Sequence, residues 1–291
     1  MNITRKEALK KMAVSSLGVA MAPSIISQAA PSTGKAARKG NINHSVCQWC
    51  YGKKTIEELC QAAVDIGIKS VELLGEKDWP TLKKYNLHCA MAYGSNIGLN
   101  KGFNDPSLHA ELLKQFTASI PKAADAGFTN VITFSGNRNG MDDMVGLENC
   151  AKGLEPVMKV AEKYGVTISM ELLNSKRNHP DYMCDLTPWG VKLVDKLGSP
   201  NFKLLYDIYH MQIMEGDVIA TIKEFHPYIS HYHTGGVPGR NEIDETQELY
   251  YPAIMKAIIE TGFKGYVAQE FIPKREDMFA SLRQSIDICD V

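Results

Sequence analysis

Four ionisable residues stand at the ends of four apolar segments in the second half of the chain: Glu171, Asp207, His233 and Glu270. Burying a carboxylate in an apolar strand is costly unless a cation or a hydrogen-bond network compensates for it. Carboxylates that converge also repel one another, and a divalent cation removes both costs. Three carboxylates and one imidazole suit Mn²⁺, Mg²⁺, Co²⁺ or Zn²⁺. We therefore predict that these residues bind one divalent metal ion, whose identity the sequence leaves open.

Each of these residues also has an ordinary structural interpretation. A carboxylate at the end of a strand can pair with a Lys or Arg at the rim, or it can cap the helix that follows. For Asp207 alone, this interpretation competes directly with metal binding. Metal binding requires that all four side chains lie side by side in the folded chain. It therefore depends on how the four strands that contain them are arranged.

Those elements repeat a single unit, in which a short apolar strand is followed by a turn and an amphipathic helix. Between the strands, apolar residues recur at three- and four-residue spacing, which is typical of helices. Several of these helices end in glycine, as at Gly67 and Gly165. The predicted strands are Ser45–Trp49, Ser70–Leu74, His88–Ala92, Val131–Phe134, Thr167–Leu172, Lys203–Asp207, Ile229–His233 and Tyr266–Phe271.

Eight strands that alternate with about eight helices over about 250 residues predict an α/β fold of the (β/α)8 type, the TIM barrel. The alternative, an open doubly wound sheet, carries a glycine-rich phosphate loop after its first strand. Residues 50–55 contain a single glycine, which favours the barrel. We predict one TIM-barrel domain over residues 43–291. In such a barrel the working residues lie at the C-terminal ends of the strands, where the four ionisable residues stand.

Composition and charge exclude several classes of protein. The formal net charge is −1 over 291 residues, without the clustered basic surface that nucleic-acid binding requires. No run of about 18 apolar residues occurs, so we expect no stable membrane anchor. We expect a small-molecule substrate as the partner, and the sequence leaves open whether the chain forms a homo-oligomer.

Residues 1–30 are predicted to be an export signal peptide. A basic start precedes a mildly apolar run over residues 12–22, and small residues follow at 27–30. Residues 4–10 resemble a twin-arginine signal, with Lys6 in the place of the second arginine. Residues 31–42 are predicted to be a linker. We expect export to the periplasm and a mature chain that begins between Ala29 and Asn43. A leader that does not function, for example an amphipathic helix, would leave the protein in the cytoplasm.

The seven cysteines are predicted to be small buried hydrophobic residues. Only Cys47 and Cys50 form a C-x-x-C pair, and this pair lies in a predicted strand, where residues three apart point to opposite faces. The odd number of cysteines also argues against a disulfide framework.

Three segments of the chain carry a resemblance to a known family: 171–182 (ELLNSKRNHPDY), 206–212 (YDIYHMQ) and 236–240 (GVPGR). From about residue 43 onwards the chain resembles the hydroxypyruvate isomerase family of the xylose-isomerase-like TIM barrels, which is related to the ketose 3-epimerases. The resemblance implies that Glu171, Asp207, His233 and Glu270 are the metal ligands. The chain departs from the hydroxypyruvate isomerases at the third ligand, where they commonly have Gln. His233 at that position is shared with the ketose 3-epimerases.

The resemblance also implies a proton-transfer mechanism. The metal would stabilise the enediolate that forms when the C–H beside a carbonyl is deprotonated. Glu171 and Glu270 would carry the proton while also binding the metal. Arg240 would bind a carboxylate or a polarised oxygen of the substrate. The full set of implied substrate-binding residues is His210, Arg240, Lys176 and His179. The structural alternatives are a buried histidine that donates to backbone for His210 and a solvated surface residue for Arg240.

Other residues with chemical potential are interpreted as structural. The three tryptophans, Trp49, Trp79 and Trp189, could stack on a sugar, but such residues more often pack in the core or at the rim. His231 lies two residues before His233 and therefore faces the same side of its strand. We expect it to support the ligands without being one.

The sequence thus predicts a metal-dependent isomerase of a small hydroxy-carbonyl compound, with hydroxypyruvate and tartronate semialdehyde as the favoured pair. The alternatives are a ketose 3-epimerase or another sugar isomerase, and a barrel that binds a carbohydrate without turning it over. The related DNA endonucleases hold several zinc ions with more histidines. The four ligands at the strand ends and the net charge of −1 disfavour that activity.

Overall fold

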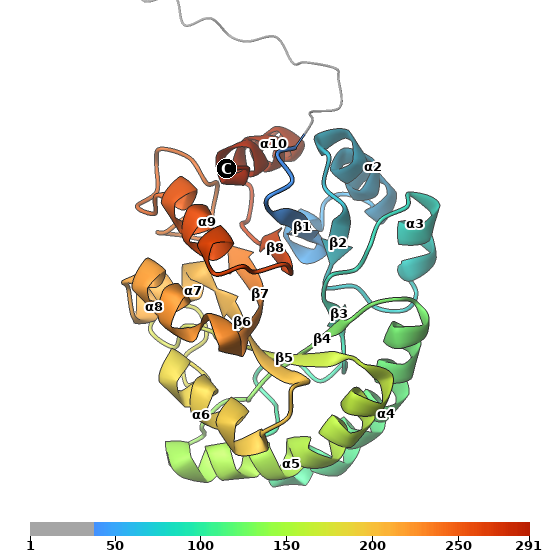
Figure 1. The fold of residues 1–291 in the computed structure, drawn as a ribbon, viewed down its shortest axis with the longest axis vertical. Helices are drawn as coiled ribbons and strands as arrows, with labels where there is room; N and C mark the ends of the chain where they lie inside the picture. The colour runs from blue at the N-terminus through green and yellow to red at the C-terminus, as the bar shows by residue number, and fades with distance from the viewer. Residues whose placement is uncertain (1–37) are drawn as a thin grey trace, which may run out of the picture. The chain divides into compact units, whose positions relative to one another are not determined.

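Eight parallel strands form the centre of the fold in the computed structural model, which describes residues 38–291 (Figure 1). Neighbouring strands follow the order β2-β1-β8-β7-β6-β5-β4-β3. Parallel bridges from Ser70 to His88 and from Leu74 to Ala92 join the two end strands, so that the sheet closes on itself. The strands are β1 (Asn43–Cys47), β2 (Ser70–Glu72), β3 (Ala92–Tyr93), β4 (Asn130–Thr133), β5 (Thr167–Glu171), β6 (Phe202–Asp207), β7 (Ile229–Thr234) and β8 (Tyr266–Gln269).

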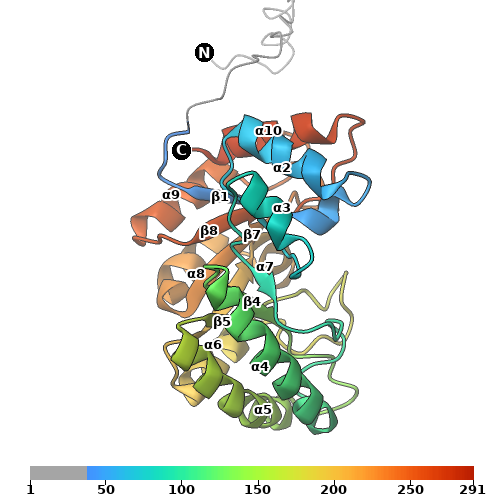
Figure 2. The same cartoon turned by 90° about the vertical axis from the view of Figure 1, so that its right-hand side faces the viewer.

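Helices surround this barrel, and Figure 2 shows several of them from the side. Except for the last one, which follows β8, each lies in a connection between one strand and the next parallel strand, as the predicted repeating unit requires. The α-helices are α2 (Ile56–Ile66), α3 (Trp79–Lys84), α4 (His109–Asp125), α5 (Asp143–Tyr164), α6 (Thr187–Leu197), α7 (Ile208–Met214), α8 (Val218–Phe225), α9 (Tyr251–Glu260) and α10 (Met278–Cys289). Three short 3-10 helices are η1 (Gln48–Tyr51), η2 (Pro106–Leu108) and η3 (His226–Tyr228). The predicted TIM barrel is confirmed.

Local sequence signals begin and end these helices. Thr55 and Glu58 form a reciprocal capping box at the start of α2, which satisfies two backbone donors there. Gly67 and Gly165 end α2 and α5 in the left-handed conformation, at φ values of 88° and 67°, which an L side chain rarely adopts. The predicted leader and residues 31–37 of the predicted linker lie outside the described residues. No helix in the described region is long and apolar enough to cross a membrane.

The first strand ends earlier than predicted, at Cys47, and the chain then turns through η1. Trp49 and Cys50 therefore lie in a 3-10 helix, and the prediction that the C-x-x-C pair lies within one strand is wrong. The expected burial of the cysteines is confirmed, because all seven are buried and free of disulfide bonds.

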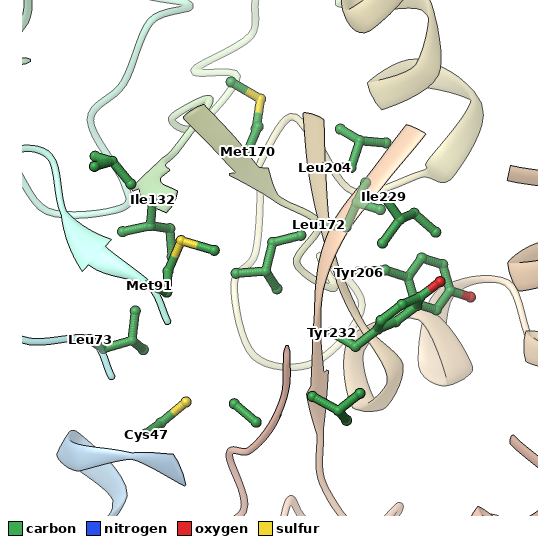
Figure 3. Close-up of a cluster of buried hydrophobic side chains, with 14 of the residues drawn as sticks. Cys47, Leu73, Met91, Ile132, Met170, Leu172, Leu204, Tyr206, Ile229 and Tyr232 are labelled. Carbon is green, nitrogen blue, oxygen red and sulfur yellow. The ribbon is translucent and has the colours of Figure 1, made fainter. Parts of the chain in front are cut away.

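Successive side chains along β6 and β7 point alternately into the hydrophobic core and toward the polar interior at the C-terminal end of the barrel. Leu204, Tyr206 and Tyr232 belong to the buried hydrophobic cluster, part of which is drawn in Figure 3. The rings of Tyr206 and Tyr232 meet edge to face, with centroids 6.1 Å apart. Asp207 and His233 are register partners on β6 and β7. Each follows one of these tyrosines in its strand and therefore points to the opposite face. The packed tyrosines thereby hold the two polar residues toward the barrel interior.

The exit of β3 depends on close packing at Gly94. A Cβ atom at Gly94 would lie 2.2 Å from Phe116 Cε1 and 2.7 Å from Val131 Cγ1, whereas a Cβ at Gly98 would meet nothing within 4 Å. We expect Gly94→Ala to lower the free energy of unfolding by about 1–3 kcal/mol, because α4 must shift away from the barrel. Gly98→Ala is the matched control and should change stability by less than about 1 kcal/mol. Urea unfolding of both variants measures the difference, and equal stabilities would contradict this account of the β3–α4 packing.

Candidate active site and metal centre

Four consecutive strands bring their ionisable residues together at the C-terminal end of the barrel. Glu171 and Asp207 are the last residues of β5 and β6, His233 lies in β7, and Glu270 directly follows β8. One ligand atom from each residue lies within 4.8 Å of the other three. All four side chains are buried. Strand register and alternation produce this convergence, since neighbouring parallel strands end at a common edge.

His233 is at the centre of the cluster and contacts carboxylates through both ring nitrogens. Its Nδ1 atom lies 2.7 Å from Glu270 Oε2 and 3.2 Å from Glu171 Oε1. Its Nε2 atom lies 3.0 Å from Oε1 of Glu72, the last residue of β2. Burial opposes a charge on the ring, but Cys47, Glu270 and Glu171 outweigh it and raise the pKa of His233 well above its usual value.

Arg240 supplies a permanent positive charge beside the same carboxylates. Its Nη2 atom lies 3.0 Å from Asp207 Oδ2 and also ion-pairs with Glu270 Oε2. The guanidinium stacks between two aromatic rings, 5.2 Å from the centroid of Trp49 and 5.4 Å from that of Tyr209. Arg240 is therefore buried inside the site, and the alternative of a solvated surface residue is excluded.

The three carboxylates of the cluster differ in their electrostatic surroundings. Burial would raise the pKa of Glu270, but ion pairs with Arg240 and His233 hold it well below its usual value. Glu171 has fewer such contacts, so burial and repulsion from Glu270 raise its pKa. Burial raises the pKa of Asp207 to about 8; Arg240 opposes that increase, and Glu270 adds to it. The side chains alone therefore supply too little positive charge for three ionised carboxylates.

This deficit and the donor set fit a divalent cation. Three oxygen donors and one imidazole nitrogen match the preferences of Mn²⁺, Mg²⁺, Co²⁺ or Zn²⁺. Two other groups have similar spacing, namely Cys47 with His233 and Glu270, and Glu72 with His231 and His233. Both share His233 with the first group, so they are extensions of one polar cluster. Only the first group offers four donors.

His210, at the start of α7, presents a fixed hydrogen-bond donor to the site. The backbone N–H of Asn174 donates to His210 Nδ1 over 3.2 Å, so the proton of a neutral ring is on Nε2. Burial and Arg240 lower the pKa of His210 well below its usual value, which keeps the ring neutral. The Nε2 atom lies 3.7 Å from Asp207 Oδ2 and has no hydrogen-bond partner in residues 38–291. A buried donor without a partner is costly and is therefore suited to binding a substrate oxygen.

The other two predicted substrate-binding residues differ in position. The His179 ring lies 5.2 Å from the His210 ring, at the edge of the site. Lys176 is exposed, and its Nζ atom donates to the carbonyl oxygens of Ile213 and Met214 over 3.1 Å and 2.7 Å. These carbonyls lie at the end of α7, so Lys176 caps this helix. The structure brings His210, Arg240 and His179 together but leaves Lys176 outside the site.

Two residues of the site escaped the sequence analysis. Trp49, assigned there to core or rim packing, donates from Nε1 to Glu270 Oε1 over 2.7 Å. Trp49 is the last residue of the predicted strand 45–49, so a signal was present, but an indole is not ionisable and was therefore not counted with the carboxylates and histidines. Glu72 lies inside the predicted strand 70–74, and the rule that strand ends carry chemistry would have found it if the strand had been ended correctly. His231 lies where expected, with Nε2 2.8 Å from Glu72 Oε1.

Comparison with known proteins assigns the chain to a family. The sequence signature of the xylose isomerase-like TIM barrels matches residues 60–288. A human protein provisionally named hydroxypyruvate isomerase is 34% identical over 261 residues, which cover 84% of each chain. A 2-oxo-tetronate isomerase of Cupriavidus necator is 34% identical over 114 residues, which cover 39% of this chain and 43% of that protein.

Among solved structures, a D-psicose 3-epimerase determined in the presence of D-fructose shares the fold. Its TM-score is 0.67 at 15% identity, over 85% of this chain and 90% of that chain. At this level of identity the likeness concerns the fold alone. The sequence matches carry the assignment: the chain belongs to the hydroxypyruvate isomerase family of the xylose isomerase-like TIM barrels and is an isomerase.

Proposed function

We propose that this isomerase interconverts hydroxypyruvate and tartronate semialdehyde by moving a proton between two adjacent substrate carbons. The observation that carries the proposal is the convergence of Glu171, Asp207, His233 and Glu270 within 4.8 Å, with Arg240 ion-paired to two of them. The names of the human and Cupriavidus necator relatives support a small keto acid as substrate.

A divalent metal ion would be held by Glu171, Asp207, His233 Nδ1 and Glu270. When bound, it supplies Lewis-acid stabilisation of the negative charge that develops on adjacent substrate oxygens as a C–H bond is deprotonated. The buried carboxylates and the deficit of positive charge around them support this assignment.

Glu171 and Glu270 are proposed to carry the proton, and their surroundings give them different starting states. Among the described residues, the Glu171 carboxylate has a hydrogen-bond partner only at Oε1, which lies 3.2 Å from His233 Nδ1, so Oε2 is available to the substrate. Burial and repulsion from Glu270 raise its pKa, which makes the carboxylate a better proton acceptor. Glu270 is bonded to Trp49, Arg240 and His233, which favours its ionised form. An asymmetric pair of this kind suits a proton that leaves one carbon and is delivered to the next.

His210 and Arg240 are proposed to orient the substrate. His210 Nε2–H would donate to a substrate hydroxyl or carbonyl oxygen. Arg240 uses Nε and Nη2 for its contacts with Glu270 and Asp207, and Nη1 has no hydrogen-bond partner within residues 38–291, so Nη1 is available to a substrate carboxylate. Because the guanidinium is held between two aromatic rings, its orientation is set before the substrate arrives.

A ketose 3-epimerase is the second candidate function. The observation that favours it is His233, whose imidazole occupies the place of the amide that is common among hydroxypyruvate isomerases. Epimerisation uses the same proton chemistry on a longer, uncharged substrate, and Arg240 would then bond a hydroxyl in place of a carboxylate.

Proton exchange in D₂O distinguishes the two functions. We expect the Mn²⁺-supplied protein to convert hydroxypyruvate to tartronate semialdehyde with deuterium at the new C–H carbon. Conversion of D-fructose to D-psicose with deuterium at C3, without turnover of hydroxypyruvate, would establish the epimerase instead. An absence of exchange into either substrate would overturn both assignments.

Replacing either proton carrier should abolish most of the turnover. We expect Glu171→Gln and Glu270→Gln each to lower kcat by at least about 100-fold, because each removes both a metal ligand and a proton acceptor. The exposed Glu224 on α8 provides the matched control, and Glu224→Gln should keep the wild-type rate. Circular dichroism melting should show folded barrels in all three variants. Wild-type turnover in either active-site variant would remove that residue from the mechanism.

His233 should make metal binding depend on pH. A proton and a metal ion compete for Nδ1, and the raised pKa of His233 favours the proton, so affinity should increase as the pH rises. Between about pH 5.5 and about pH 7.5 the Kd for Zn²⁺ should fall by up to about 100-fold, as release of one proton allows. His233→Gln should bind Zn²⁺ more weakly and lose part of this dependence. Isothermal titration at both pH values measures it, and identical curves for the two proteins would take His233 out of the metal centre.

A further inference from the structure

Glu72 is a fully buried carboxylate for which the proposed reaction has no direct use. It forms no ion pair with a Lys or Arg of residues 38–291, although a buried carboxylate normally requires such compensation. Its Oε1 atom instead lies 2.8 Å from His231 Nε2 and 3.0 Å from His233 Nε2, and the Cys47 thiol donates weakly to it over 3.9 Å. Its Oε2 atom has no hydrogen-bond partner. The Glu72 carboxylate therefore lies against the Nε2 side of the His233 ring.

This contact determines where the proton of His233 lies. An ionised carboxylate only accepts hydrogen bonds, so the Nε2 atoms of both His231 and His233 must be donors. The opposite nitrogen of His233, Nδ1, faces Glu171 Oε1 and Glu270 Oε2 at 3.2 Å and 2.7 Å. Histidine binds a metal through a nitrogen that has no proton, and its other ring N–H is usually held by a carboxylate or carbonyl. Glu72 stands where this second partner is needed.

We propose that Glu72 is a positioning residue, which holds the proton of His233 on Nε2 and so leaves Nδ1 free to bind the divalent metal. This inference rests on the proposed metal centre. His231 bonds the same carboxylate oxygen and thereby keeps that oxygen directed at His233. A glutamine at position 72 could turn its NH₂ group toward Nε2, which would move the proton to Nδ1 and block the ligand position.

The Sγ atom of Cys47 offers a matched control at the same nitrogen. It lies 3.7 Å from His233 Nε2 and 3.9 Å from Glu72 Oε1, so Cys47→Ala removes a contact from both residues but leaves the Glu72 carboxylate in place to hold the proton. Loss of packing at this edge of His233 can therefore be separated from loss of the Glu72 carboxylate.

Metal affinity tests the proposal without any substrate. We expect Glu72→Gln to raise the Kd for Zn²⁺ by about 10–100-fold, as removal of such an outer partner does in other metal sites. Cys47→Ala should change it by less than about threefold. In a His233→Gln background, Glu72→Gln should have almost no further effect on the Kd, because the ligand imidazole that Glu72 orients is absent. An equal loss in both backgrounds would show that Glu72 acts on the fold in general and would overturn the proposal.

Nitrogen NMR of histidine-labelled wild-type protein gives a second readout that needs no variant to fold. In the Zn²⁺-loaded protein, we expect His233 to carry its proton on Nε2 and to bind the metal through Nδ1, with His231 also protonated on Nε2. A Zn²⁺-loaded His233 with its proton on Nδ1 would overturn the role of Glu72. A wild-type protein that binds no divalent metal would overturn the metal centre itself, and the two failures are thus distinguishable.

Discussion

Crowding of negative charge at the mouth of the barrel is the constraint on which the rest of the site depends. Glu171, Asp207 and Glu270 surround the His233 ring in a region that water scarcely reaches. At such separations and at low polarity, like charges repel strongly. One guanidinium and one imidazole lie beside these carboxylates, but burial and the neighbouring glutamates still raise the pKa of Asp207. A divalent cation would complete the balance, and this is the basis of the proposed metal centre.

The surroundings of this cluster limit the freedom of each group in it. Arg240 is held between Trp49 and Tyr209, and Trp49 also donates to Glu270. His210 is fixed as a neutral donor by the backbone of Asn174. Each group is therefore aimed before a substrate binds, so less of the substrate's binding energy is spent on ordering the site.

The polar network extends past the metal ligands to the far side of His233. Glu72 joins β2 to β7 through two histidines, while the proposed metal ligands join β5, β6, β7 and β8. His233 is thus the contact between two groups of strands. Under the proposed role of Glu72, a substitution there changes the protonation of Nδ1 on His233, a residue 161 positions away in the sequence.

The sequence by itself determined the architecture and the four converging residues. Periodicity is a local property, and in a closed parallel barrel it is sufficient to place strand ends at one mouth, so Glu171, Asp207, His233 and Glu270 could be selected from the strand ends alone. The export signal predicted for residues 1–30 also rests on sequence alone. The tertiary structure decided which further side chains reach the site. Trp49 and Glu72 join it because a 3-10 turn and a three-residue strand direct them inward, whereas Lys176 is diverted to the carbonyls of α7. Such outcomes depend on the exact residue at which a strand ends and on contacts between residues far apart in the chain, and spacing along the sequence fixes neither.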